Sequence, residues 1–336
     1  MSFLSGNKTW PRLREINSFD FLDFLEDKQS LTRDQFNFYN KKGVLGPIKL
    51  EFLDQIDLKV FEKIITHQGD LSDYYYKSQK ILSIAIHPEV LSKVKSILGE
   101  NVILLNDTII YVAPNKQLDA THSDIQGGAT IMGDNFYDND SGFLNVWVSI
   151  TGTNSKNAPL HFFPGTHQWP INPIILHIES ISKHPEKINY FAKLFTIFDK
   201  SEYIRRSHRL HLQVINDIYP QHILSDIQRY EIYTKPGECI FFHPHVLHGS
   251  FTNQTSKPRI SIALRYRKAE DKPMNFGFTR ENLLHYYTDS ELDGLGLDHK
   301  EDKLPALQVA GNKHHKKYKA VRVDLLSRLI ESKGYY

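Results

Sequence analysis

The prediction of the fold starts from the stretch His122-Ser123-Asp124, whose His and Asp side chains lie on one side of the chain only if the backbone is extended. Side chains alternate between the two faces of a β-strand, so a His and an Asp two residues apart point the same way. An imidazole and a carboxylate on one side of a strand are two ready ligands for a divalent metal. A third ligand has to come from a distant part of the chain.

The third ligand is expected from residues 237–250, which read Gly-Glu-Cys-Ile-Phe-Phe-His-Pro-His-Val-Leu-His-Gly-Ser. This segment holds His243, His245 and His248, and the residues alone leave all three open. Two histidines and one carboxylate with open coordination positions form the facial triad of non-haem Fe(II) sites. Eleven residues after His248 lies Arg259, whose guanidinium suits a carboxylate held by two parallel hydrogen bonds.

The order of these motifs resembles a known family. His122-x-Asp124, a Gly-x-x-x-Phe-Phe strand, His248-Gly-Ser, Asn253 and Arg259 together resemble the phytanoyl-CoA dioxygenase (PhyH-like) family of Fe(II)/2-oxoglutarate-dependent oxygenases. A lone His-x-Asp is unspecific, whereas the ordered set is much more specific. In the family register His248 is the distal ligand.

A second segment, Ala158-Pro-Leu-His-Phe-Phe-Pro-Gly-Thr-His-Gln-Trp169, is similar to the family's Gly-Pro-Leu and Pro-Gly-Ser-His sequences. It departs from them at two positions, with Ala158 in place of the Gly and Thr166 in place of the Ser.

The resemblance assigns roles to single residues. His122, Asp124 and His248 are the expected metal ligands and catalytic residues. Arg259 is expected to pair with the distal carboxylate of 2-oxoglutarate. Ser261, two residues further along the same strand, faces the same way and is expected to add a hydrogen bond.

Other residues near these positions have less specific signals. Trp147 stands where family members carry a Trp beside the co-substrate, although an ordinary core Trp fits the pattern equally well. Thr108 or Asn106, in the β-rich stretch before the motif, is expected to contact 2-oxoglutarate. We interpret Arg265 and Arg267 as surface or substrate-facing residues.

Four further histidines are interpreted as packed side chains or as residues around the pocket rather than as ligands: His161, His167, His243 and His245. The chain has 17 histidines, so a His is not a clue by itself.

The resemblance implies a dioxygenase with Fe(II), 2-oxoglutarate and O2, which hydroxylates an unactivated C–H bond of a small, polar metabolite such as an amino acid, a sugar or a natural-product intermediate. The retained Asp124 favours hydroxylation, or less often desaturation or cyclisation, because related halogenases lack this carboxylate. The main alternative is a catalytically silent jelly-roll binding or scaffold protein. A Zn or Mn hydrolase has no need of Arg259, and the motif spacing disfavours histone-demethylase-like or prolyl-hydroxylase-like oxygenases.

The expected fold class is α+β, with a double-stranded β-helix (jelly roll, cupin-like) core flanked by helices, as the resemblance implies. Sequence alternation alone supports a β-rich core flanked by helices. We expect a helical extension over 1–30, an oxygenase domain over 31–267 with a helical insertion at about 170–230, and a C-terminal extension over 268–336 that ends in a short helix at 321–332.

Local patterns place the elements around the motif. Thr32 is a suitable N-cap and Gly43 a suitable end for one helix, and Pro88 and Gly99 delimit another. Helical spacing is also present over 50–67. Strands are expected at 102–105, 108–112, 143–150, 230–234, 238–242 and 260–266, and residues 158–169 are expected to form a strand that runs into a tight turn.

The composition limits the other classes of function. The chain has 336 residues, of which 40% are hydrophobic, so it can bury a sizeable core. A net charge of +2 predicts neither nucleic-acid nor membrane binding. The single cysteine, Cys239, excludes an internal disulfide framework and favours a cytoplasmic location, and no signal peptide is recognised. A small-molecule substrate is the expected partner, and the sequence does not predict the oligomeric state.

Overall fold

The computed structural model describes residues 30–55, 61, 65, 74–76, 78–118, 121–124, 142–168, 228–269, 288, 290, 307–310 and 321–322. The N-terminal extension, apart from its last residue, and nearly all of the expected insertion at about 170–230 lie outside these residues.

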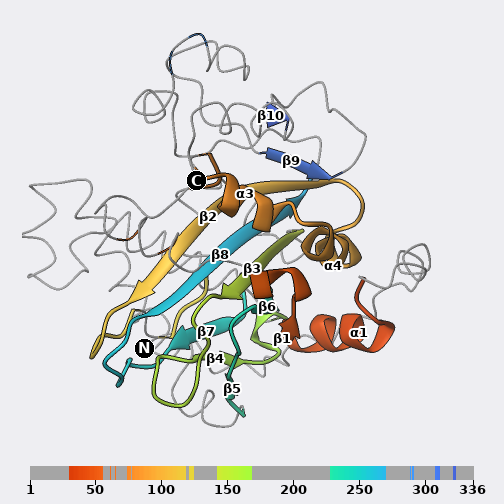
Figure 1. Cartoon of the computed structure of the whole chain (residues 1–336). Coiled ribbons are helices and arrows are strands. Elements are labelled where there is room, and N and C mark those ends of the chain that lie inside the picture. The colour runs from red at the N-terminus through yellow and green to blue at the C-terminus, as the bar shows by residue number, and fades with distance from the viewer. Residues whose placement is uncertain are drawn as a thin grey trace, which may run out of the picture.

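Two sheets, antiparallel except where β10 joins β9, form the body of the protein (Figure 1). The larger sheet has seven strands in the order β1-β6-β3-β8-β2-β9-β10, and the smaller has the order β5-β4-β7. The strands are β1 (Val44–Lys49), β2 (Val102–Val112), β3 (Phe143–Ser149), β4 (Leu160–Phe163), β5 (Tyr230–Ile232), β6 (Glu238–Phe242), β7 (Leu247–Ser250), β8 (Arg259–Lys268), β9 (Leu307–Ala310) and β10 (Val321–Arg322).

The helices follow the signals in the sequence. Helix α1 (Arg33–Lys42) begins with a capping box between Thr32 and Gln35 and ends at Gly43, whose φ of 73° is left-handed. Helix α4 (Pro88–Leu98) has its proline in the first turn. The other described helices are α3 (Gln79–Ala85) and the 3-10 turns η2 (Glu51–Gln55), η3 (Tyr74–Tyr76) and η5 (Thr166–Gln168).

The two faces of the larger sheet pack against different parts of the protein, as the residues of strand β8 show. Its even-numbered residues Ile260, Ile262, Leu264 and Tyr266 are buried in one hydrophobic cluster with residues of α3 and α4. Its residue Ala263 belongs instead to a second cluster, shared with β4 and β6. One face therefore packs against helices, and the other faces the smaller sheet.

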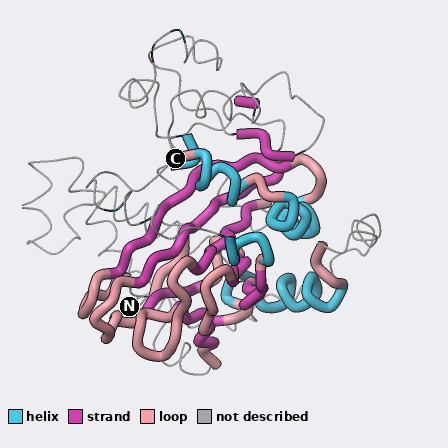
Figure 2. Tube along the Cα trace, viewed as in Figure 1, coloured by secondary structure: helices cyan, strands magenta, loops and turns pink. Residues whose placement is uncertain are grey.

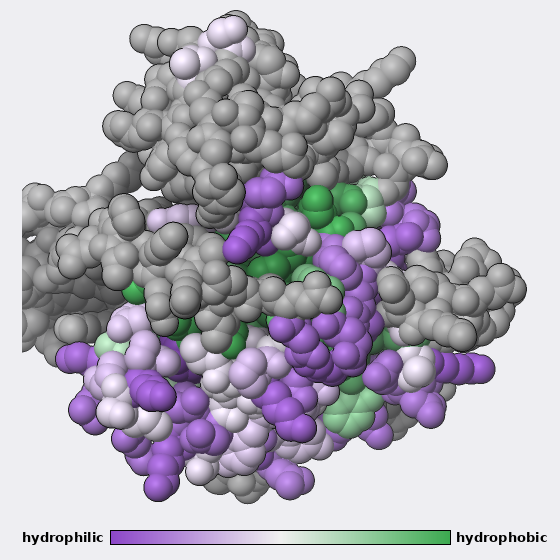
Figure 3. Space-filling model, viewed as in Figure 1, coloured by the Kyte–Doolittle hydropathy of each residue, from purple (hydrophilic) through white to green (hydrophobic). Residues whose placement is uncertain are grey.

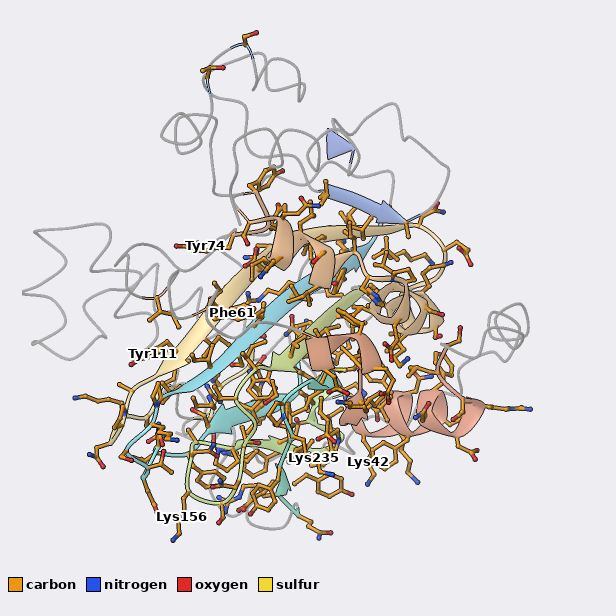
Figure 4. All side chains as sticks on the ribbon, viewed as in Figure 1. Lys42, Phe61, Tyr74, Tyr111, Lys156 and Lys235 are labelled. Atoms are coloured by element: carbon orange, nitrogen blue, oxygen red, sulfur yellow. The ribbon has the colours of Figure 1, made fainter. Side chains whose placement is uncertain are left out.

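This arrangement confirms the expected fold: a jelly roll of two facing sheets with helices on the outside. Figure 2 shows the long strands crossing the molecule, with the helices along one side. Phe61, fully buried in the helix-side cluster, lies over the long strands (Figure 4). On the face in Figure 3, hydrophobic residues gather over the long strands and hydrophilic residues cover the rim near β4 and β5.

Strand β2 differs from its prediction, because residues 102–112 form one strand rather than two. The polar pair Asn106-Asp107 was expected to break it. Both side chains have partners that let the strand continue: Asp107 accepts a hydrogen bond from the Tyr75 N–H at 2.8 Å, and Asn106 accepts one from Arg265 at 3.3 Å. Pairing with β8 shifts register between Leu104 and Asn106.

The C-terminal region also differs from its prediction. Strand β9 pairs with β2, and β10 pairs with β9 in parallel, so this region extends the larger sheet. The short helix predicted from residue 321 is wrong for Val321 and Arg322, because their backbones pair with Leu307 and Gln308. Over 50–67, the described part begins with the 3-10 turn η2.

No helix among the described residues is both long enough and apolar enough to cross a bilayer.

Candidate metal centre

The segment that carries His122 and Asp124 lies against β7, which carries His248. The His122 N–H donates to the His248 carbonyl at 2.8 Å, and the His248 N–H returns a bond to the His122 carbonyl at 2.9 Å. The Asp124 N–H donates to the Pro244 carbonyl at 2.9 Å. This antiparallel bridge continues the smaller sheet by one short segment, so the two distant motifs meet through backbone hydrogen bonds.

The three predicted ligands converge on one point. One ligand atom from each of His122, Asp124 and His248 lies within 4.8 Å of the other two. Asp124 Oδ1 is 3.5 Å from His122 Nε2 and 3.9 Å from His248 Nε2. This is the only such group of three or more His, Cys, Asp or Glu side chains within the described parts of the chain.

Two neighbours orient the ligands. Asn145 on β3 donates from Nδ2 to Asp124 Oδ2 at 2.5 Å, which leaves Oδ1 directed at the histidines. His248 Nδ1 lies 2.9 Å from the Val246 carbonyl. Because a carbonyl only accepts, Nδ1 carries the proton and the Nε2 lone pair is left for a metal.

The groups around Asp124 keep its carboxyl group ionised. Burial alone raises the pKa of this carboxyl, but His248, His122 and Arg265 outweigh burial and lower the pKa well below its usual range. Asp124 is therefore ionised at neutral pH, the state that a metal ligand requires.

A pocket connects this centre with Arg259. Polar and apolar side chains both line it: Ile110, Leu118, His122, Asp124, Asn145, Trp147, Leu160, Phe242, His248, Gly249, Ser250, Arg259, Ala263 and Arg265. The expected residues Thr108 and Ser261 do not line it. Thr108 instead accepts a hydrogen bond from Arg265 at 3.0 Å.

Arg259 is 1% exposed, so it is not a solvent-exposed cation at the end of the strand. Its Nη1 donates to the Ala158 carbonyl at 3.0 Å, and its guanidinium lies 5.4 Å from the centre of the Trp147 ring. Ala158 has a φ of 58°, in the left-handed region. Glycine adopts this region without strain, which is a physical reason for the Gly of the similar sequences.

Arg267 was interpreted as a surface or substrate-facing residue. It is 2% exposed, does not line the pocket, and lies 4.7 Å from the centre of the Phe143 ring. Strand β8 extends to Lys268, one residue beyond Arg267, and this keeps the side chain inside the fold.

The remaining histidines are packed residues. His161 Nε2 is 3.0 Å from Thr121 Oγ1, and His167 Nε2 is 3.1 Å from the Asn40 carbonyl. His243 lies between His167 and His245, with ring centres 5.4 Å and 4.7 Å away. None of the four lines the pocket.

Acid is expected to destabilise the protein through His161. Burial, followed by Arg229, lowers the pKa of His161 to about 4. Because the unfolded imidazole has a pKa of about 6.5, the unfolded state binds more protons below that pH, and stability falls as pH decreases from about 6.5 to about 4. The upper limit is roughly 3 kcal/mol, at about 1.4 kcal/mol per pKa unit.

Urea unfolding of the wild type and His161→Gln across this pH range measures the contribution. The variant keeps a polar side chain beside Thr121 but does not titrate, so its stability should depend less steeply on pH. Equal slopes for the two proteins would contradict the assignment. The half-buried His167 and His243 also have lowered pKa values and act in the same direction.

A family model and two individual proteins that match this chain are all described as phytanoyl-CoA dioxygenases. The model of the family described as "Phytanoyl-CoA dioxygenase (PhyH)" matches residues 54–261. The peroxisomal phytanoyl-CoA dioxygenase of Rattus norvegicus is 20% identical over 229 residues, which are 66% of this chain and 55% of the rat protein. The Homo sapiens protein is 21% identical over 240 residues, 71% of this chain and 58% of the human protein. The chain thus spans little more than half the length of these relatives.

Solved structures share the fold. The non-haem α-ketoglutarate-dependent carbocyclase SnoK from nogalamycin biosynthesis has a TM-score of 0.52 and 14% identity, covering 82% of this chain and 93% of SnoK. The non-haem monooxygenase ThoJ in complex with Ni has a TM-score of 0.52 and 13% identity, covering 90% and 94%. CytC3 with Fe(II) and α-ketoglutarate has a TM-score of 0.52 and 15% identity, covering 87% and 93%.

Proposed function

Because this chain belongs to the phytanoyl-CoA dioxygenase (PhyH) family, we propose that it is an Fe(II)/2-oxoglutarate-dependent dioxygenase that hydroxylates an unactivated C–H bond of a small, polar metabolite. The observation that carries the proposal is the convergence of His122, Asp124 and His248 in a pocket that also contains the buried Arg259. Two imidazoles and one carboxylate are the ligand set of non-haem Fe(II) oxygenases.

The donor set fits the metal. His122 and His248 would bind through neutral nitrogens and Asp124 through one anionic oxygen, which leaves a divalent metal with one positive charge. That charge suits an anionic 2-oxo acid, and three protein ligands leave coordination positions open. When bound, Fe(II) together with 2-oxoglutarate and O2 supplies the oxidising chemistry.

The other end of the pocket fits the co-substrate. Trp147 Nε1, Ser250 Oγ and Ser261 Oγ are buried and have no hydrogen-bond partner among the described residues. Trp147 and Ser250 line the pocket with Arg259, and Ser261 lies two residues along β8 from it. Buried polar atoms are normally hydrogen-bonded, so this end favours a polar ligand. We assign Arg259 the distal carboxylate of 2-oxoglutarate, with Trp147 and Ser261 beside it, and place Thr108 next to Arg265.

Anaerobic titration with Fe(II) and 2-oxoglutarate tests the proposal directly. The chelate of a 2-oxo acid with Fe(II) has a weak visible charge-transfer band, and this band should appear in the wild-type protein. If folded, metal-loaded protein develops no band, the protein is instead a scaffold that keeps the site, or it uses another metal.

Asn145→Ala is expected to weaken metal binding by about 10- to 100-fold, because the loss of an outer partner lets a ligand reorient. The variant removes the donor to Asp124 Oδ2 while all three ligands remain. Titration with Co(II) measures the affinity. The control is Ser149→Ala, which truncates another buried β3 side chain that does not line the pocket. Equal Co(II) affinity in the wild type and Asn145→Ala would disprove the orienting role.

A further inference from the structure

Strand β8 brings a second arginine to the pocket. Arg259, Ser261, Ala263 and Arg265 alternate with the residues that face the helices, so Arg259 and Arg265 are on the same face of the strand. Six residues of strand separate their Cα atoms by about 20 Å. Both line the pocket, which therefore has a guanidinium near each end.

Arg265 lies at the end with the metal centre. It pairs with Asn145 across β3 and β8, and Asn145 holds Asp124 Oδ2. Arg265 and Asp124 line the same pocket, but the two side chains form no ion pair in the described part of the chain, where Asp124 pairs with His122 and His248. Arg265 is therefore beside the ligands without being bonded to them.

Among the described residues, the contacts of Arg265 leave most of its N–H donors unused. Nη1 donates to Asn106 Oδ1 at 3.3 Å and to Thr108 Oγ1 at 3.0 Å. These acceptors are neutral, so they fix the guanidinium without cancelling its charge. A guanidinium has five N–H donors in a planar fork that matches carboxylates and phosphates. Arg265 is half-buried, whereas Arg259 is 1% exposed, so its outer donors remain accessible to a ligand.

The net charge of the pocket also favours an anionic ligand near Arg265. Its described lining has two cations, Arg259 and Arg265, and one acid, Asp124. With a divalent metal and dianionic 2-oxoglutarate bound, one positive charge remains in excess. This excess positive charge belongs to Arg265, because the co-substrate is assigned to Arg259. A neutral substrate would leave this charge uncompensated in a partly buried site.

We propose that Arg265 binds an anionic group, a carboxylate or a phosphate, of the primary substrate, and so positions the substrate beside the metal centre. This inference rests on the proposed function and narrows its substrate class from polar metabolites to small anions. Arg259 serves the co-substrate and Arg265 serves the substrate.

Calorimetric titration of the anaerobic Fe(II)/2-oxoglutarate-loaded protein tests the proposal with benzoate, its neutral isostere benzamide, and inorganic phosphate. Wild-type protein should bind benzoate or phosphate, and benzamide more weakly. Arg265→Gln keeps an amide donor for Thr108 but removes the charge, and should weaken anion binding by about 10- to 100-fold. Arg265→Lys, which keeps the positive charge, should recover part of the affinity for anions. The control is Lys235→Gln, which removes an exposed cation labelled in Figure 4 and should bind like the wild type.

The visible chelate band, followed in the same samples, separates two kinds of failure. If the wild type forms no chelate, the proposed function fails. If the chelate forms, three results would overturn the substrate assignment alone: no anion binds, benzamide binds as well as benzoate, or anions bind Arg265→Gln undiminished. A loss of the band on adding benzoate would also overturn it, because the anion would then be occupying the co-substrate site at Arg259.

Discussion

Asp124→Ala and His248→Ala are expected to abolish 2-oxoglutarate turnover while the protein stays folded. Each removes one of three side chains whose ligand atoms converge within 4.8 Å, and Asp124 is the only anion among them. Loss of one of the three protein ligands should weaken Fe(II) binding and change the coordination position that it filled. Succinate formation in the presence of Fe(II), 2-oxoglutarate and O2 measures turnover, and the chelate band measures loss of the site.

The control for these variants is Asp34→Ala, which removes an exposed carboxylate in the first turn of α1. It should form succinate like the wild type. Circular dichroism and thermal unfolding without metal establish that the ligand variants are folded. Normal succinate formation by folded Asp124→Ala or His248→Ala would refute the assignment of the triad.

Arg259→Ala is expected to raise the KM for 2-oxoglutarate by about 100-fold, which corresponds to a few kcal/mol, as expected when a charge-assisted pair is lost. The side chain is buried against Trp147 and the Ala158 carbonyl, so its removal should also lower stability. Arg259→Lys separates the two effects, because it keeps the charge and most of the volume but loses the planar fork.

The matched control is Arg33→Gln, which removes an exposed guanidinium from α1. Steady-state kinetics with varied 2-oxoglutarate, together with chelate titrations, measure the effect. If folded Arg259→Ala shows the wild-type KM for 2-oxoglutarate, Arg259 does not bind the co-substrate.

Much of the fold could be predicted from sequence because the signals are local. Thr32 and Gly43 delimit α1 through their own backbone and side-chain geometry, and an N-cap needs no information from the rest of the chain. Strand alternation alone singled out His122 and Asp124 as ligands, whereas the choice of His248 over His243 and His245 needed the family resemblance. The meeting of His122 with His248 depends on pairing of segments more than 100 residues apart, which alternation alone does not specify.

The sequence did not reveal features that depend on tertiary partners. Asn106 and Asp107 signal a break, yet β2 continues, because Arg265 and the Tyr75 N–H satisfy their side chains. The contact of Asn145 with Asp124 was missed for the same reason. Strand parity places Asn145 beside Trp147 on the inward face, but only the folded chain shows which group its amide reaches.

Along β8, the arginines lie on one face and the large apolar residues on the other, so only one pairing register of this strand gives a stable fold. A slip of one residue against β2 and β3 would move Arg259 and Arg265 among the apolar residues that pack on α3 and α4, and would expel Ile260, Ile262 and Leu264 from that cluster. Burial of two unpaired guanidiniums would make the slipped chain unstable. Every stably folded molecule therefore has its arginines in place. Arg265 also donates hydrogen bonds to Asn106 and Thr108 on β2, so a mutation that changes the ligand at position 265 also changes the contacts of this strand.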